Sequence, residues 1–160
     1  MVSDENQREI QKINKIAGAI EDLSPIFGVF LEKYRSLIGR NFETEGQYFG
    51  EPFKPLKPAY RRWKEKKYPG RKILQLERRM ITAARGIGSN AYQKITPDSL
   101  EFGIRGGESG LPYAKRQQKS RPFFYRSNGT LPIQGLRVLR EGLEDYVRRV
   151  VEIAKQRGAL

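Results

Sequence analysis

The sequence predicts an α+β domain, in which a small antiparallel sheet packs against long amphipathic helices at both ends of the chain. In both terminal thirds the apolar residues recur at steps of three and four, which is the period of a helix. Between them, two short segments of alternating character flank Pro97-Asp98-Ser99, whose residues favour a turn. The chain has 160 residues, the size of one domain, so we expect a single domain over residues 1–160. An all-α bundle is the alternative.

Two helices are predicted in the N-terminal third. The first runs from about Asp4 to Asp22 and the second from about Pro25 to Phe42. The pair Ser24-Pro25 separates them, because serine suits an N-cap and proline suits the first turn of a helix.

The middle of the chain is predicted to hold shorter elements. Residues 43–70 are interrupted by glycine and proline, which indicates loop and turn around a short helix beginning at Pro58. A further helix is expected from Ile73 to Arg85, with Gly86 as its stop. The hairpin strands are expected at Ala91 to Thr96 and Leu100 to Arg105, the second strand having one buried face.

The last helix has a clear apolar stripe and is expected to end near Gly158. With the two N-terminal helices it is expected to cover the sheet and supply the core. The stripe consists of Leu136, Leu139, Leu143, Tyr146, Val147, Val150 and Ala154.

The composition excludes several kinds of site. The chain contains no cysteine and no histidine, so a disulfide, a thiolate metal site and a histidine base are all ruled out. The acidic residues show no metal-binding spacing, and the short glycine pairs do not form a phosphate-binding motif. We therefore expect no catalytic residues, no metal, no cofactor and no enzymatic activity, with a carboxylate–metal nuclease as the least supported alternative.

No apolar run approaches the roughly 20 residues of a membrane span, and no secretory signal is visible, so we expect no membrane contact and a location in the cytoplasm.

The charge predicts an acidic partner. Lysine and arginine number 31 against 18 aspartate and glutamate residues, a net charge of +13. Such a balance favours contact with nucleic acid, an anionic membrane or an acidic protein surface, although a merely soluble basic surface remains open.

Two segments concentrate this charge and are the predicted contact surfaces for a protein partner or DNA. The first runs from Lys54 to Lys72, and its basic residues are Lys54, Lys57, Arg61, Arg62, Lys64, Lys66, Lys67, Arg71 and Lys72. The second runs from Lys115 to Arg126 and is expected to be a presented loop; its basic residues are Lys115, Arg116, Lys119, Arg121 and Arg126. Aromatic residues among the cations of the first segment suit nucleic acid, but an aromatic side chain can equally attach a segment to the core. The residues expected to act as structural anchors are Phe53, Trp63, Tyr113, Phe123 and Phe124.

Several short motifs occur in an order that resembles the phage virion-morphogenesis family, the tail-completion proteins related to the G protein of phage Mu. The motifs span most of the chain, from about Ile10 to Tyr146. They are Phe42-Glu43-Thr44-Glu45-Gly46 after the helices, Gly50 to Tyr60 with its prolines, Ile73 to Met80, Phe102-Gly103-Ile104, Pro112-Tyr113-Ala114 and Arg121-Pro122-Phe123-Phe124. The chain departs from the family pattern in having Phe53 for a tryptophan, Glu77-Arg78 for threonine-glycine, and the more basic Arg116 to Lys119 after the tyrosine-alanine pair.

This resemblance implies a structural role. Members of the family complete the tail at its head-proximal end as a ring of identical subunits, commonly six, and offer a docking face to the neck. It implies self-association, contacts with tail-tube and neck or connector proteins, DNA in the lumen as a further partner, and a place in the virion after assembly in the host cytoplasm. A basic nucleic-acid-binding protein and a neck or head–tail adaptor are the alternatives.

Overall fold

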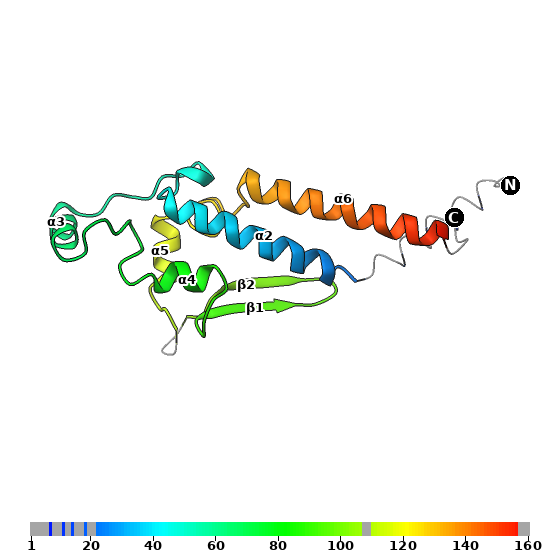
Figure 1. Ribbon diagram of the computed structural model, residues 1–160, viewed down its shortest axis with the longest axis horizontal. Helices are drawn as coiled ribbons and strands as arrows, with labels where there is room; N and C mark the ends of the chain where they lie inside the picture. The colour runs from blue at the N-terminus through cyan, green and yellow to red at the C-terminus, as the bar shows by residue number, and fades with distance from the viewer. Residues whose placement is uncertain are drawn as a thin grey trace.

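The fold comprises long helices, short helices and one hairpin (Figure 1). The structure is a computed structural model and describes residues 22–106 and 110–156 and the single positions 7, 11, 14 and 18. The combination of helices with a two-stranded antiparallel sheet confirms the predicted α+β class. The elements in chain order are α2 (Ser24–Glu43), the 3-10 helix η1 (Gln47–Phe49), α3 (Pro58–Lys67), α4 (Arg79–Ala84), β1 (Ala91–Ile95), β2 (Leu100–Ile104), α5 (Ala114–Ser120) and α6 (Ile133–Gln156).

The predicted first helix, from Asp4 to Asp22, lies almost wholly outside the described residues. Its four described positions, Gln7, Gln11, Asn14 and Gly18, are helical and exposed.

The start of α2 differs slightly from the expectation. Ser24 is the first residue of the helix and not its cap, and Pro25 follows in the first turn. The Asp22 carboxylate accepts a hydrogen bond of 2.9 Å from the backbone N–H of Ser24. It therefore satisfies one of the free N–H groups that every helix start exposes. Hydrogen bonding from Ser24 also holds the pKa of Asp22 below its ordinary value.

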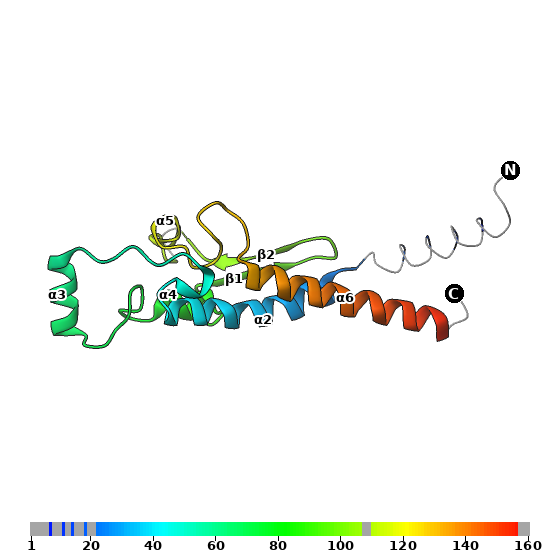
Figure 2. The same cartoon turned by 90° about the horizontal axis from the view of Figure 1, so that it is seen from above.

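The two long helices pack against each other through glycines of α6. A Cβ at Gly135 would lie 2.5 Å from Cε2 of Tyr34, and one at Gly142 would lie 3.6 Å from Cγ2 of Ile26. The missing side chains let the two helix backbones approach closely. The C-terminal half of α6 continues past the start of α2 and the hairpin turn (Figures 1 and 2).

The hairpin packs against α2 and α4, whereas α6 packs mainly against α2. The prediction that the last helix covers the sheet is therefore wrong: α2 and α4 cover it instead. The strands are antiparallel with Ile95 opposite Leu100. Leu100, Phe102 and Ile104 are half-buried against the core, which confirms the predicted apolar face of the second strand.

The helix predicted from Ile73 to Arg85 is wrong in its first half, because α4 begins only at Arg79. Leu74 and Arg78 have positive φ angles of 64° and 59°, which no helix accommodates. Tertiary hydrogen bonds take this stretch out of the helical path: the Ile73 N–H donates to the Glu45 carboxylate, and the Gln75 side chain to the carbonyl of Phe42. The predicted stop is confirmed, since Gly86 has a φ of 79° directly after α4.

Aromatic rings fill the core. Tyr34 is fully buried between Phe30, at 5.1 Å between ring centroids, and Phe49, at 6.1 Å. Its hydroxyl donates to the backbone carbonyl of Phe124, and burial raises the pKa of this phenol. Asn41 is equally buried; its amide donates to the carbonyl of Pro122 and its oxygen accepts from the N–H of Phe49. Helix α2 is therefore joined by polar as well as apolar contacts to η1 and to the distant segment of residues 122–124.

Candidate interaction surface

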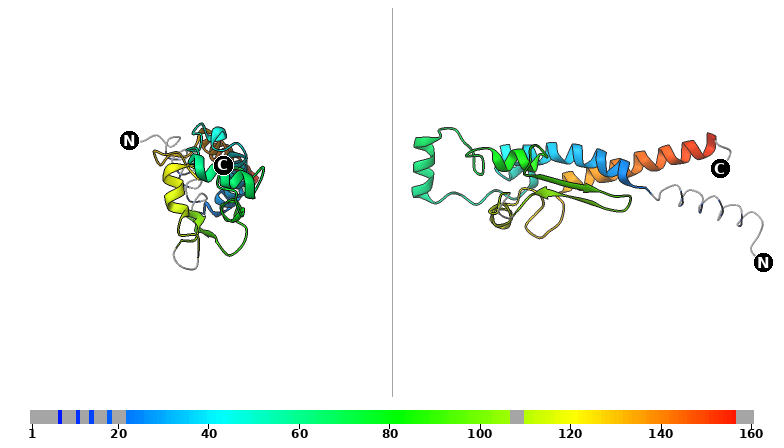
Figure 3. Two further views of the ribbon diagram at one scale, coloured as in Figure 1. Left: turned by 90° about the vertical axis from the view of Figure 1, so that its left-hand side faces the viewer. Right: turned by 90° about the horizontal axis from the view of Figure 1, so that it is seen from below.

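A projecting segment, here called the arm (residues 50–78), carries α3 away from the rest of the molecule. Figures 1 and 2 show α3 at one extreme of the long axis, at the end of two connecting segments, with α6 reaching toward the other extreme. The same elongated shape is visible from below in Figure 3. Helix α3 begins at Pro58, as predicted, because proline fits the first turn, where its missing N–H has no partner to lose.

The tip of the arm carries an aromatic cluster, formed by the exposed Tyr60 and Trp63 and the half-buried Tyr68. The Tyr60 and Trp63 rings stack with 5.2 Å between centroids, and Tyr68 meets Trp63 edge-on at 5.9 Å. The Lys67 ammonium lies 5.6 Å from the centroids of both Trp63 and Tyr68, within reach of a cation–π contact.

The prediction that Trp63 anchors the segment to the core is wrong, since its side chain is 44% exposed. Trp63 packs instead on neighbouring rings of the arm itself, where the helix period brings Tyr60 and Trp63 together. Exposed tryptophan and tyrosine beside cations are typical of binding surfaces.

Most of the cations predicted in the first basic segment are exposed, but Lys64 is not. The exposed ones are Lys54, Lys57, Arg61, Arg62, Lys66, Lys67, Arg71 and Lys72. Lys64 is buried, and its ammonium donates to the backbone carbonyl of Lys72. Burial lowers the pKa of Lys64, while nearby Glu45 acts in the opposite direction. The predicted partner contact through Lys64 is thus corrected: this residue joins α3 to the returning chain.

Two further arm cations have partners within the chain. Arg61 pairs with Glu65 one turn along α3, with 2.8 Å between Nε and Oε1. Lys72 contacts both the carboxylate and the carbonyl of Glu43 at the end of α2. A cation suits that position because the helix C-terminus carries partial negative charge.

The first half of the second basic segment forms a short helix, α5, in place of the expected loop, and residues 121–126 follow it without regular structure. Gln118 fixes the following turn: its oxygen accepts the N–H groups of Phe123 and Phe124, and its amide donates to Tyr125. The exposed cations here are Lys115, Arg116, Lys119 and Arg126. Sequence reasoning missed Gln118, since a single glutamine carries no signal of burial.

Arg121 and Arg126 connect this segment to the arm. The Arg121 guanidinium donates to the carbonyl of Lys54 at 2.8 Å and to the side chain of Gln117 at 2.7 Å. Arg126 pairs with Glu51 at 3.1 Å. Two cations predicted to contact a partner thus contact the chain itself at the base of the arm.

The remaining predicted anchors divide into two groups. Phe53 and Phe123 are buried, and Phe124 is half-buried against the same core, in agreement with the prediction. Tyr113 is 43% exposed, so its expected role as a core anchor is wrong.

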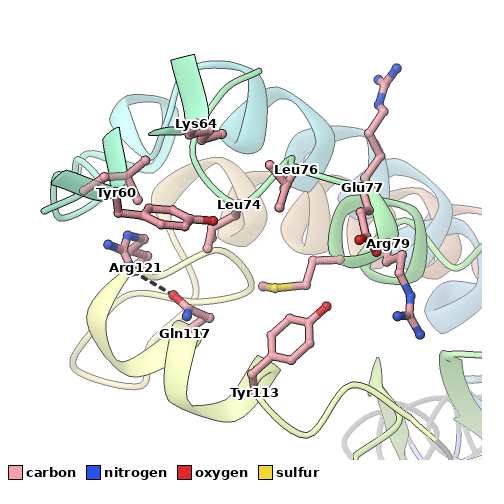
Figure 4. Close-up of a pocket in the computed structure, with 12 residues that line it drawn as sticks. Tyr60, Lys64, Leu74, Leu76, Glu77, Arg79, Tyr113, Gln117 and Arg121 are labelled. Atoms are coloured by element: carbon pink, nitrogen blue, oxygen red, sulfur yellow. Dashed lines mark hydrogen bonds between the residues drawn. The ribbon is translucent and has the colours of Figure 1, made fainter. Parts of the chain in front are cut away.

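Tyr113 instead lines a cavity of about 420 Å³ between the arm, α4 and α5. The rings of Tyr60 and Tyr113 point into this cavity, and Arg121 lies at its edge, hydrogen-bonded to Gln117 (Figure 4). The apolar part of the lining is Leu56, Leu74, Leu76 and Met80, and the charged part is Lys64, Glu77, Arg78, Arg79 and Arg121. Such a lining suits an apolar side chain flanked by acidic groups.

Within residues 22–106 and 110–156, no group of three or more acidic side chains is placed to hold a metal ion. Among the helices of that part of the chain, none has the length and apolar character that crossing a bilayer requires.

Comparison with known proteins adds no relative: no family model, no curated protein and no solved structure matches the chain.

Proposed function

We propose that this chain is a structural subunit of a phage tail, of the tail-completion or tail-terminator type, which assembles with copies of itself into a ring of six subunits and joins the tail to the neck. The motifs that resemble the virion-morphogenesis family support this assignment. The observation that carries it is the arm, a projecting element with exposed aromatic side chains and exposed cations far from the core (Figure 2). An arm of this kind suits contact with a neighbouring macromolecule better than chemistry on a small molecule.

The shape also meets a requirement of rings. A ring uses one patch of each subunit against a different patch of the next, so the subunit needs two unlike surfaces. The arm at one extreme of the long axis and α6 at the other are unlike in charge and composition (Figure 2). The proposed place of the protein is the head-proximal end of the tail, with tube and neck proteins as partners.

The arm gives a specific prediction. We expect the double change Tyr60→Ala with Trp63→Ala to abolish ring formation and incorporation into tails, because it removes the exposed rings while leaving the core intact. Light scattering after size exclusion should show the wild-type protein as a multiple of 18.5 kDa and the variant as a single subunit. Thermal unfolding should shift little, since exposed side chains away from the core change stability by about 0.5 kcal/mol.

The matched control is Ile87→Ala, which removes another exposed apolar side chain, 54% exposed, outside the arm. This variant should assemble like the wild type. The proposal fails if the wild-type protein stays monomeric at high concentration and is absent from purified virions.

The arm also favours one second candidate, a nucleic-acid-binding protein that contacts DNA directly. Its exposed cations surround rings on which bases can stack, which is the combination that single strands bind. This function requires binding to random DNA that weakens steeply as salt rises, because counterions are released from the phosphates. Absence of binding at low salt would exclude it.

A further inference from the structure

Two arginines cross between α2 and the end of α4, and each lies against a glycine of the opposite segment. Arg35 of α2 lies against Gly86, because a Cβ at Gly86 would come 2.1 Å from the Arg35 Cζ atom. Arg85 lies against Gly39 of α2, where a Cβ would come 3.3 Å from the Cδ and Nε atoms of Arg85. The missing side chains at both glycines therefore let the two arginine side chains pack close to backbone, which limits where each guanidinium can lie.

Neither guanidinium has a partner in the part of the chain that the structure describes. Within residues 22–106 and 110–156, no ion pair involves Arg35 or Arg85, and no hydrogen bond reaches either guanidinium. The Nε atom of Arg35 is buried, and its N–H has no acceptor. Burial also lowers the pKa of Arg35, because it disfavours the charged form. Since buried donors in native proteins are nearly always satisfied, this N–H needs an acceptor that the described residues do not supply.

Both arginines line one hollow of about 310 Å³, which lies between α2, the chain after α4 and β1. Helices α2 and α4 and strand β1 pack against one another (Figure 1). Ser36 of α2 and Gln93 of β1 also line the hollow, and both side chains can donate hydrogen bonds. A Cβ at Gly28, which belongs to the same lining, would meet nothing within 4 Å. The hollow therefore offers several donors and room for an incoming group.

The charge of this lining favours a single monoanion. Glu32 is the one acid among the lining residues of the described chain, and it forms no ion pair with either arginine. Two guanidinium groups and one carboxylate leave a single positive charge. An added carboxylate matches that charge and accepts two parallel N–H bonds from one guanidinium, whereas a row of nucleic-acid phosphates would bring further negative charge toward Glu32. Leu31 and Ile95 form an apolar wall that suits the aliphatic part of an organic acid.

We infer that Arg35 and Arg85 form a binding site for a carboxylate, which accepts the Nε–H of Arg35 and a hydrogen bond from Arg85. The carboxylate comes from an acidic side chain of a partner protein or from a small organic acid, since both present the same group. None of the residues that line the hollow belongs to the arm. The inference therefore goes beyond the proposed function and does not depend on it.

Nuclear magnetic resonance of the arginine side chains tests this site directly, since each Nε–H group gives its own signal. The Arg35 signal in the full-length protein is identified by its loss in Arg35→Gln. We expect this signal to move downfield and to saturate as sodium acetate is added at constant ionic strength, because the proton gains an acceptor. The signal of Arg137, an exposed arginine of α6, should stay in place.

A second probe and a second variant make the test specific. Glutamate with an acetylated amine and an amidated α-carboxyl presents its side-chain carboxylate between two peptide groups. If it binds more tightly than acetate, the site takes a protein side chain; equal or weaker binding assigns the site to a small acid. Arg85→Gln, at an exposed position, should weaken acetate binding at least about tenfold, since it removes a charge-assisted hydrogen bond. The matched control is Arg137→Gln, which changes the net charge equally and should leave the affinity for acetate unchanged.

Four results would overturn the inference. The first is the absence of a saturable shift of the Arg35 signal with either carboxylate. The second is a signal already at the hydrogen-bonded position before any carboxylate is added, since an acid of the chain itself would then supply the acceptor. The third is an equal loss of affinity in Arg85→Gln and Arg137→Gln, which would indicate charge screening alone. The fourth is tighter binding of inorganic phosphate than of both carboxylates. Subunit mass, measured on the same samples, reports on the ring proposal separately.

Discussion

Replacing Phe42 with alanine is expected to destabilise the protein by about 3–5 kcal/mol. The Phe42 side chain is fully buried at the end of α2. Its ring contacts Phe53 edge-on at 6.0 Å between centroids and Phe123 at 5.2 Å. Truncation removes the contacts that join α2 to the first residues of the arm and to the turn after α5, and it leaves a cavity that these segments can fill only by moving.

Urea denaturation of the wild-type and variant proteins measures this loss, with the midpoint converted through the slope of the transition. The control is Phe42→Leu, which keeps most of the buried volume and should cost less than about half as much as alanine. A loss below about 1 kcal/mol for Phe42→Ala would mean that the three rings do not form a common core.

Replacing Gly46 with alanine is expected to cost about 3 kcal/mol or more. Gly46 follows α2 with a φ of 92°, a conformation that residues with a Cβ avoid. A Cβ there would lie 2.2 Å from the backbone carbonyl oxygen of Glu51 and 2.8 Å from the backbone nitrogen of Phe53. Neither atom can rotate away, so the backbone at the base of the arm must shift.

Gly50 provides a matched control for this change. Its φ is 79°, close to that of Gly46, but a Cβ at Gly50 would meet nothing within 4 Å. Gly50→Ala should therefore cost only the conformational part, about 1–2 kcal/mol. Equal losses for the two variants, measured by the same denaturation, would contradict the steric explanation.

Phe42 and Gly46 both lie beside the base of the arm. Substitutions at these two positions therefore connect the stability of the fold to the proposed function. Phe53 contacts Phe42 and also lies against Gly46, which places one aromatic anchor at the arm's base. We expect partly destabilised variants at this base to lose assembly before they lose their fold, since they displace the arm while α2 and α6 stay packed.

Periodicity alone determined the elements whose signals are local. The helix beginning at Pro58, the two hairpin strands and the last helix occur where the sequence predicts them, because proline placement, alternation and three–four spacing are properties of consecutive residues. The cation-rich character of the arm was equally readable from composition.

Only the tertiary structure decided which residues of these elements are available to a partner. Trp63 is exposed and Lys64 is buried, although they are neighbours, because the path of the returning chain places the carbonyl of Lys72 beside Lys64. Arg121 and Arg126 contact the arm because of distant carbonyl and carboxylate groups. The shortened α4 reflects distant partners too, since its lost first turns contribute hydrogen bonds to Glu45 and Phe42. The charge of the chain was thus evident from the sequence, but its division between internal contacts and a free surface depended on contacts between residues far apart along the chain.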